Sequence, residues 1–333
     1  FLIGFFEIFA LLVIVSVIIF WLRRNVINIK RFLSAEMKGW PKNDGNIILY
    51  VEIILMLLFL TMNGADLWIQ QNAPDYNYIK AGSFPVSQFI LPLFDGISSN
   101  IVFIIERVAW WLHIIGILCF LNYLSYSKHL HIILAFPNTY FANLNPKGKF
   151  SNLESVTKEV KMMLDPSADP FAASSTQEIA KFGASDVFDL NKIQLLNAYT
   201  CTECGRCTSE CPANLTGKKL SPRKIMMDTR DRLEEVGRNI DLNKGDYKSD
   251  GKELLNDYIS KEELWACTSC NACVEACPIG IDPLSIIMDM RRYLVMEKSD
   301  APMELNNMMS NIENNGAPWP FNQMDKLNWK NEL

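Results

Sequence analysis

Eight of the nine cysteines in this chain fall into two copies of one spacing. The first copy reads Cys201-Thr-Glu-Cys204-Gly-Arg-Cys207-Thr-Ser-Glu-Cys211-Pro212, and the second reads Cys267-Thr-Ser-Cys270-Asn-Ala-Cys273-Val-Glu-Ala-Cys277-Pro278. Both follow the pattern C-x2-C-x2-C-x3-C-P without a single departure. A repeat of this length and accuracy requires a common ligand chemistry rather than chance.

The spacing is the one with which bacterial ferredoxins bind [4Fe–4S] clusters. Three cysteines at steps of three lie on one loop and reach three irons, whereas the fourth, followed by proline, belongs to the other cluster. We therefore expect two clusters. The first is assigned Cys201, Cys204, Cys207 and Cys277, and the second Cys267, Cys270, Cys273 and Cys211. Such a chain transfers single electrons.

Two other uses of cysteine explain the pattern less well. Structural zinc takes four cysteines in C-x2-C pairs, which accounts neither for the third cysteine nor for the Cys-Pro step. A disulfide framework suits small secreted domains and not a chain of this size with apolar segments. The ninth cysteine, Cys119, lies in an apolar segment and is expected to be a buried thiol.

The first third of the chain carries three long apolar segments, at residues 1–22, 47–64 and about 97–126. Each reaches or approaches the ~20 residues that a membrane-spanning helix needs. Residues 86–94 are shorter and contain Pro92, so we expect an interfacial or re-entrant piece there, with a fourth span as the alternative. The first segment lacks a basic leader and a small-residue cleavage site, and is interpreted as a retained anchor.

Loop charges predict the orientation of these spans. The first loop contains six basic residues, Arg23, Arg24, Lys30, Arg31, Lys38 and Lys42, whereas residues 65–96 contain only Lys80. The positive-inside rule places the first loop in the cytoplasm. Three spans then place the chain after Ser127 in the cytoplasm too. We expect a multi-pass protein of the inner membrane with its iron–sulfur domain in that reducing compartment.

The chain has three histidines, His113, His129 and His131. In one continuous helix His113 and His131 would be five turns and about 27 Å apart, on the same face. Di-haem cytochrome b subunits present haem ligands in this way, so haem b is one interpretation. The second span offers no histidine, and the other ligand would be a methionine or a histidine of another membrane subunit. The other interpretation is polar packing at the headgroups.

Three carboxylates interrupt the apolar segments, Glu7, Glu52 and Glu106. A carboxylate is costly in lipid, so each is expected to face protein, a cavity or water. Glu52 and Glu106 are candidates for a quinone and proton site. The alternative is a helix-end carboxylate that reaches the headgroup region.

The remaining pattern predicts an all-α protein. Transmembrane helices over 1–135 are followed by a linker at 136–190 with an amphipathic helix at 152–164, a dicluster ferredoxin domain at 191–300, and a tail at 301–333. Helices are predicted at 222–236, capped by Ser221, at 253–259 and at 283–296. No period-2 strand is convincing. The tail, with Trp319 and Trp329, is expected to dock on a partner; the alternative is a disordered end.

At residues 190–300 the chain resembles the helical iron–sulfur domain of the heterodisulfide reductase family, in which Cys277-Pro-Ile-Gly-Ile-Asp-Pro283 followed by a helix is characteristic. The segments Trp110-Trp-Leu-His113 and Ser127-Lys-His-Leu-His131 resemble the cytochrome b and nitrate reductase gamma subunits that partner these proteins. The resemblance implies a membrane-anchored protein with a cytoplasmic partner that is cysteine-rich or contains flavin. Full-length members continue into a cysteine-rich catalytic module. No cysteine follows Cys277, so we expect the substrate-reducing chemistry on another polypeptide.

The expected function is an electron-transfer subunit of a membrane oxidoreductase complex. It would relay electrons between a membrane quinone, through haem b if one is bound, and a cytoplasmic partner. Two alternatives remain: a self-contained quinone-reactive oxidoreductase, and a non-catalytic iron–sulfur scaffold or redox sensor. The net charge of −5 and the lack of a basic stripe argue against a nucleic-acid partner.

Overall fold

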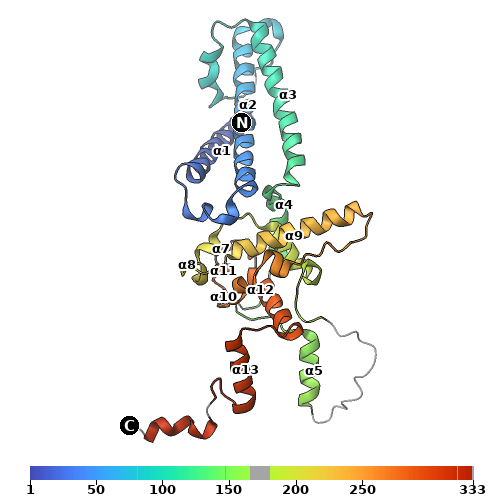
Figure 1. The fold of residues 1–333 in the computed structure, drawn as a ribbon. Coiled ribbons are helices and arrows are strands. Elements are labelled where there is room, and N and C mark those ends of the chain that lie inside the picture. The colour runs from blue at the N-terminus through green and yellow to red at the C-terminus, as the bar shows by residue number, and fades with distance from the viewer. Residues whose placement is uncertain (81, 147, 166–180, 321, 332–333) are drawn as a thin grey trace. The chain divides into compact units, whose positions relative to one another are not determined.

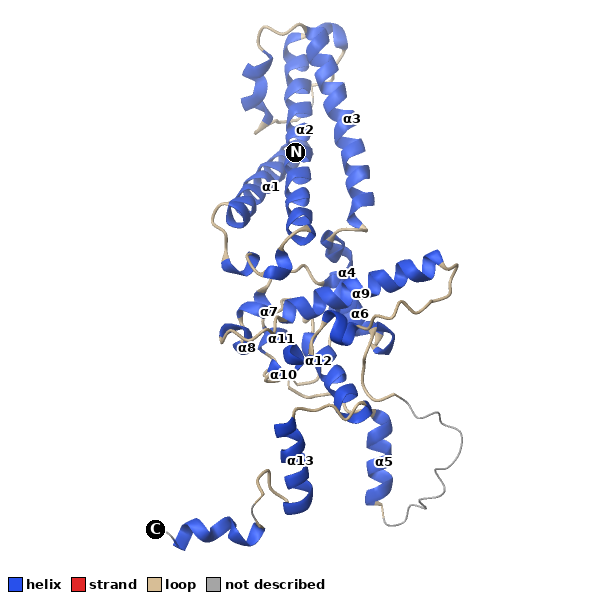
Figure 2. Cartoon of the chain, in the orientation of Figure 1, coloured by secondary structure: helices blue, strands red, loops and turns tan. Residues whose placement is uncertain are grey.

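A computed structural model describes residues 1–80, 82–146, 148–165, 181–320 and 322–331. Within these ranges the secondary structure is helical and contains no strand (Figure 2), which confirms the all-α prediction. The chain divides into two compact units. The first comprises Phe1–Ala142, Leu196–Glu210 and Ala276–Ile281, and the second Asn143–Leu195, Cys211–Glu275 and Asp282–Leu333. Residues 166–180 of the predicted linker lie outside the described residues.

Three long helices dominate the first unit: α1 (Leu2–Asn25), α2 (Trp40–Asn72) and α3 (Ser99–Leu124) (Figure 1). Each is long and apolar enough to cross a bilayer, as predicted, and the chain is a membrane protein. Cys119 is exposed on α3 rather than buried, because α3 packs against α2 and leaves its other side free. Gly116 marks that contact: a Cβ there would lie 2.7 Å from Cδ2 of Leu55.

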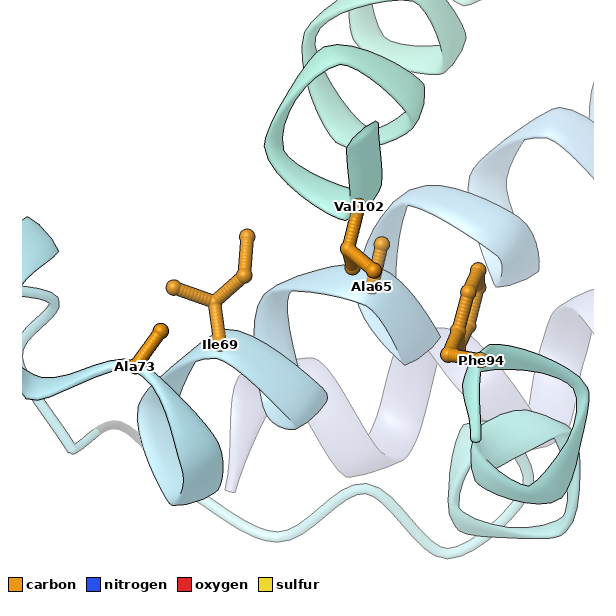
Figure 3. Packing of buried hydrophobic residues seen from close by; sticks show 5 residues of the cluster. All are labelled: Ala65, Ile69, Ala73, Phe94 and Val102. Carbon is orange, nitrogen blue, oxygen red and sulfur yellow. The ribbon is translucent and has the colours of Figure 1, made fainter. Parts of the chain in front are cut away.

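Small side chains bring the helices together at the end of the bundle where α2 leads into α3. Ala65 and Ile69 of α2, and Ala73 directly after this helix, form a buried cluster with Val102 of α3 and with Phe94 (Figure 3). The small side chain of Ala65 permits this close approach, since apolar helices in lipid associate mainly through packing. Phe94 belongs to η4 (Ser87–Phe94), a 3-10 helix, so the segment at 86–94 is a short packed element and not a fourth span.

Glu7 holds η4 in place. Its carboxylate is fully buried and accepts hydrogen bonds from Nδ2 of Asn63 (3.1 Å) and from the backbone amides of Val86 (2.9 Å) and Ser87 (3.1 Å). Ser87 also donates its hydroxyl to the carbonyl of Leu60 at 3.1 Å. Glu7 therefore faces protein, as a carboxylate inside a membrane domain must, and it ties α1, α2 and η4 together.

The third span does not continue as far as His131. α3 ends at Leu124, near the predicted end, and is followed by η5 (Lys128–Leu130) and α4 (His131–Tyr140), so the continuous helix through both histidines that the di-haem interpretation required does not form. The cause is Asp44 of α2. Its buried carboxylate accepts hydrogen bonds from the hydroxyls of Tyr123 (2.5 Å) and Ser127 (2.6 Å) and from the amide of Lys128 (3.0 Å), and this diverts an amide that a longer helix would use internally.

The second unit is a set of shorter helices around one apolar core. Its main elements are α5 (Glu154–Leu164), α8 (Pro212–Leu215), α9 (Pro222–Leu242), α10 (Lys261–Ala266), α11 (Ala272–Glu275), α12 (Pro283–Arg292) continued by η8 (Tyr293–Glu297), α13 (Met303–Asn315) and η9 (Gln323–Asn331). Ile225, Leu254, Leu264 and Ile286 are among its fully buried side chains. Trp319 and Trp329 of the tail are exposed.

Side-chain caps fix where these helices begin. Ser221 caps α9, with Pro222 in its first turn as predicted, and Ser260 and Asp282 cap α10 and α12. α9 continues to Leu242, beyond the predicted end. The predicted helix at 253–259 is wrong: η7 (Leu254–Tyr258) is interrupted by extended backbone at Leu255 and by Asn256 at φ +78°.

Candidate iron–sulfur sites

The two cysteine loops share one backbone conformation. Glu203 (φ +57°) and Gly205 (φ +74°) in the first loop occupy the same places as Ser269 (φ +56°) and Asn271 (φ +60°) in the second. A short helix follows each loop, α7 (Arg206–Ser209) and α11. Left-handed residues next to right-handed ones turn successive backbone N–H groups to one side, where they form a concave anion site of the kind that holds iron–sulfur clusters.

Four cysteines of the second unit line one cavity. Cys211 arrives from the end of the first run, and Cys267, Cys270 and Cys273 come from the second loop. The remaining lining is mostly apolar: Pro212, Leu220, Pro222, Leu284 and Ile287, with Thr268 and Asn271. The amide of Ser269 donates a hydrogen bond to Sγ of Cys267 at 3.4 Å. Four thiols, an amide that donates to sulfur and a mostly apolar lining suit a thiolate-ligated cluster.

Arg291 is a cation that lies near Cys267, one of this cavity's thiols. Its Nη2 donates to the carbonyls of Leu264 (2.6 Å) and Cys267 (2.5 Å), and its guanidinium lies over the ring of Trp265 at 5.0 Å. Burial raises the pKa of the Cys267 thiol, and the nearby Arg291 charge acts in the opposite direction. Arg291 is bonded to backbone carbonyls, so its positive charge stays available to the thiolates.

The other four cysteines belong to the first unit. Burial, together with the charges of the neighbouring Cys204 and Cys277 thiolates, raises the pKa of Cys207 to about 11. Cys277 therefore lies beside Cys207 although it comes from the end of the second run. Buried thiols that repel one another as anions need a positive partner to ionise together, and iron supplies that charge.

The four thiols of the second unit line a cavity. Across the described ranges, no group of three or more His, Cys, Asp or Glu side chains lies close enough to hold a single metal ion. A tetrahedral zinc ion would hold each sulfur at about 2.3 Å from one atom. A cubane takes its ligands at four separate iron corners, so this spread is compatible with it.

Two of the three histidines orient their rings in the same way. Nδ1 of His113 lies 2.9 Å from the carbonyl of Leu55, and Nδ1 of His131 lies 3.0 Å from the carbonyl of Lys128. A carbonyl on one ring nitrogen leaves the other free, which is the usual arrangement of a metal-binding histidine. Nε2 of His129 instead lies 3.9 Å from the carboxylate of Glu52. Burial lowers the pKa of His129, and His131 lowers it further.

Glu52 and Glu106 do not form one site. Glu52 lies beside His129, where α3 has ended. Glu106 is buried beside Arg107 and accepts a hydrogen bond from the hydroxyl of Tyr78, in the connection between α2 and α3, at 3.1 Å. The two carboxylates thus lie at different ends of the helix bundle. A role of both in quinone or proton chemistry would need two separate sites.

Comparison with known proteins adds to this geometry. A 4Fe–4S dicluster domain family matches residues 200–281. The chain is 31% identical to the probable iron–sulfur-binding oxidoreductase FadF of Bacillus subtilis over 306 residues, 84% of this chain and 40% of that protein. It is 26% identical to an EtfAB:quinone oxidoreductase of Syntrophomonas wolfei over 91% of this chain and 43% of that protein.

A probable membrane-anchored ferredoxin of Chromohalobacter salexigens is 31% identical over 46% of this chain and 25% of that protein. No solved structure matches the chain. The chain spans less than half of the length of these relatives. Its homologues are thus iron–sulfur oxidoreductases, a membrane-anchored ferredoxin and C subunits of heterodisulfide reductases. The chain is therefore similar to heterodisulfide reductase-like, membrane-anchored iron–sulfur proteins, and its residues 200–281 carry a 4Fe–4S dicluster domain.

Proposed function

We propose that this chain is the electron-transfer part of a membrane oxidoreductase, with two [4Fe–4S] clusters that connect a membrane quinone to a cytoplasmic redox partner. One observation carries the proposal. Each unit contains one complete set of four cysteines, and each set combines three cysteines of one run with the last cysteine of the other. Such crossed sets are what two clusters that share their runs require.

The ligand assignment follows from these sets. Cys201, Cys204, Cys207 and Cys277 would hold the first cluster. Cys267, Cys270, Cys273 and Cys211 would hold the second, and the shared cavity supports that grouping. A [4Fe–4S] cluster supplies reversible one-electron transfer. The chain's own part is to present thiolates, to aim amides such as that of Ser269 at sulfur, and to keep water away with Leu284 and Ile287.

Quinone is proposed as the membrane-side redox partner. The similarity to a protein named EtfAB:quinone oxidoreductase supports this choice, and so does the pairing of Glu52 with His129 at the end of the spans, where a proton donor would serve quinone reduction. Haem b remains part of the proposal through the free ring nitrogens of His113 and His131. Its second ligand would come from a methionine or from another membrane subunit.

The orientation and the partner belong to the same proposal. The six basic residues from Arg23 to Lys42, at the end of α1, in the loop and at the start of α2, favour a cytoplasmic position for that loop, with the iron–sulfur domain on the same side of the inner membrane. Heterodisulfide reductase subunits among the relatives support assembly with a further redox subunit. A cysteine-rich or flavin-containing protein would fill that place.

Chemical analysis of the purified full chain tests the proposal. We expect about eight irons and eight acid-labile sulfides per chain, the content of two cubanes. Haem extraction, with reduced-minus-oxidised optical spectra, decides the haem part. Four irons or fewer after anaerobic purification and reconstitution would contradict the proposal, and zinc in their place would replace it with a structural role.

A self-contained quinone-reactive oxidoreductase is the second candidate, and the Glu52–His129 pair favours it. The two candidates differ in turnover. When supplied with an electron donor other than dithionite, a self-contained enzyme would turn over a soluble quinone analogue without any added protein. The electron-transfer subunit would do so only after its cytoplasmic partner is supplied.

A further inference from the structure

The first cysteine loop is held by an ion pair from the membrane unit itself. Nζ of Lys128 binds the carboxylate of Glu203 and donates to the carbonyl of Pro41 at 2.7 Å. Both partners are withdrawn from water, since their side chains are 9% and 2% exposed. Lys128 begins η5, four positions after Leu124 at the end of α3, and Glu203 lies between Cys201 and Cys204. A segment at the end of a membrane helix therefore forms an ion pair with the middle of a cysteine loop.

Glu203 depends on the ion pair with Lys128 for two reasons. It adopts φ +57°, a left-handed conformation that a long side chain rarely adopts without support from its surroundings. Its carboxylate is also buried, and a buried charge is strongly unfavourable once its partner is removed. The equivalent residue of the second loop, Ser269, carries no charge and bonds within its own unit to Arg291 and Met288. The ion pair is thus specific to the first loop.

A second contact supports the segment that follows Cys277, the fourth cysteine of the first-cluster set. Nδ2 of Asn138, in α4, donates to the carbonyl of Ile279 at 2.9 Å, two residues after Cys277. Asn138 is only 3% exposed, and in the described part of the chain its Oδ1 has no hydrogen-bond partner. Burying an amide is costly, and the bond to Ile279 is the interaction that offsets the cost.

A third contact lies on the first cytoplasmic loop. The short helix α7, which contains Cys207, lies against η1 (Lys30–Phe32) between the first two spans. All three contacts fall inside the first unit. The loops that carry Cys201, Cys204, Cys207 and Cys277 are therefore assembled on the ends of the membrane helices.

We propose that the membrane unit completes the first cluster site, with Lys128 and Asn138 as positioning residues, and that this cluster is the one that exchanges electrons with the membrane quinone, through haem b where haem is bound. The inference rests on the proposed function, because it needs the first cluster to exist. The step balances when two reduced clusters each lose one electron and one quinone takes up two electrons and two protons to become the hydroquinone.

Variants of the full chain in detergent test the positioning part. Lys128→Met removes the cation that is bonded to the buried Glu203, so we expect one reduced-cluster EPR signal to weaken and its midpoint potential to become more negative. The affected signal should be the one that Cys204→Ser abolishes. Asn138→Leu should weaken the same signal without the charge-driven shift of potential. The double variant Lys128→Met/Glu203→Gln removes the stranded carboxylate and should restore most of the signal.

Lys224→Met is the matched control. Lys224 is a partly buried lysine of the second unit, paired with Asp228 at 2.7 Å and Glu263 at 3.0 Å, and its loss should leave the first-cluster signal unchanged. Two normal signals in the Lys128→Met chain, or equal loss of both, would overturn the inference. Absence of two cluster signals from the unmodified chain would overturn the proposed function as well, so the two failures are distinguishable.

Oxidation by quinone tests the electron-exchange part. The reduced chain is mixed with a short-chain naphthoquinone, and each cluster is followed in variants that lack the other one. Cys270→Ser, which keeps the first cluster, should be reoxidised at a rate near that of the unmodified chain. Cys204→Ser, which keeps the second, should be reoxidised at least tenfold more slowly. Equal rates, or faster oxidation of the second cluster, would overturn the inference.

Discussion

The two cysteine loops have the same spacing and the same left-handed turns, but their surroundings differ. The first loop contains Glu203, which is neutralised by Lys128 from the membrane unit. The second contains uncharged Ser269 and faces Arg291, which is bonded to backbone carbonyls. The cysteine spacing therefore determines the backbone shape of a ligand loop, whereas residues far away in the sequence determine the net charge around that loop. Since positive charge favours the reduced form of a cluster, the second cluster is expected to have the higher potential of the two.

The largest effect is expected from the crossed cysteines. Cys211→Ser alters the first run but should abolish the second cluster, and Cys277→Ser alters the second run but should abolish the first. Each variant should keep about four irons, the content of one cubane. EPR potentiometry identifies the cluster that remains. If each substitution removed the cluster of its own run, the crossed assignment would be wrong.

The support of the first loop should be the next most sensitive. Asp44→Asn weakens the bonds to Tyr123, Ser127 and the amide of Lys128. Loss of a buried charged acceptor with three donors should lower the free energy of unfolding by roughly 2 kcal/mol. Thermal unfolding in detergent measures it. Asp95→Asn, an acidic site in the loop that precedes α3, is the comparison, and an equal loss in both variants would show that Asp44 has no special role.

Removing Arg291 should bring the two sites closer in potential. Arg291→Gln takes away the cation beside Cys267, and we expect the second cluster's midpoint to fall by about 60 mV, which corresponds to about 1.4 kcal/mol for one electron. Arg292→Gln serves as the control, because Arg292 is already paired with Asp289 at 2.8 Å. If the potential of the first cluster fell instead, Arg291 would act on the first cluster and the assignment of this charge to the second loop would be wrong.

The smallest effect concerns the helix contact that supports the second loop. Lys224 of α9 lies between Asp228 of the same helix and Glu263 of α10, which leads to Cys267. Burial raises the pKa of Asp228 to about 6, despite the opposing effect of Lys224. Between the unfolded pKa near 3.9 and pH 6, the folded state therefore holds more protons than the unfolded one, and stability falls as pH rises.

From pH 5 to pH 6 this contribution amounts to about 1 kcal/mol, and it levels off above pH 6. Asp228→Asn should remove that slope and leave the unfolding temperature flatter across the same interval. Calorimetric or fluorescence-monitored unfolding at several pH values between 5 and 7 checks it. A slope that survives the substitution would assign the pH dependence to another group.

Local sequence signals predicted the three spans, the Ser221 cap and the helical class, because apolar runs and capping residues act over a few neighbouring positions. Long-range polar contacts were missed. The break after Leu124 depends on Asp44, 80 positions earlier than Leu124, and the Lys128–Glu203 pair joins a membrane helix end to a cysteine loop. The predicted helix at 253–259 also failed, because the amide of Leu255 donates to the distant carbonyl of Ser185 at 3.0 Å and Asn256 adopts φ +78°. The spacing of residues in the sequence does not predict these long-range contacts.

The most direct test of the central claim is a spin count on the fully reduced full-length chain. Double integration of its EPR spectrum should give about two spins per chain, one for each reduced [4Fe–4S] cluster. A count near two, together with two separable midpoint potentials, is the result that the two crossed sites predict. A count that stays at one or below in fully iron-loaded protein would contradict a two-cluster relay.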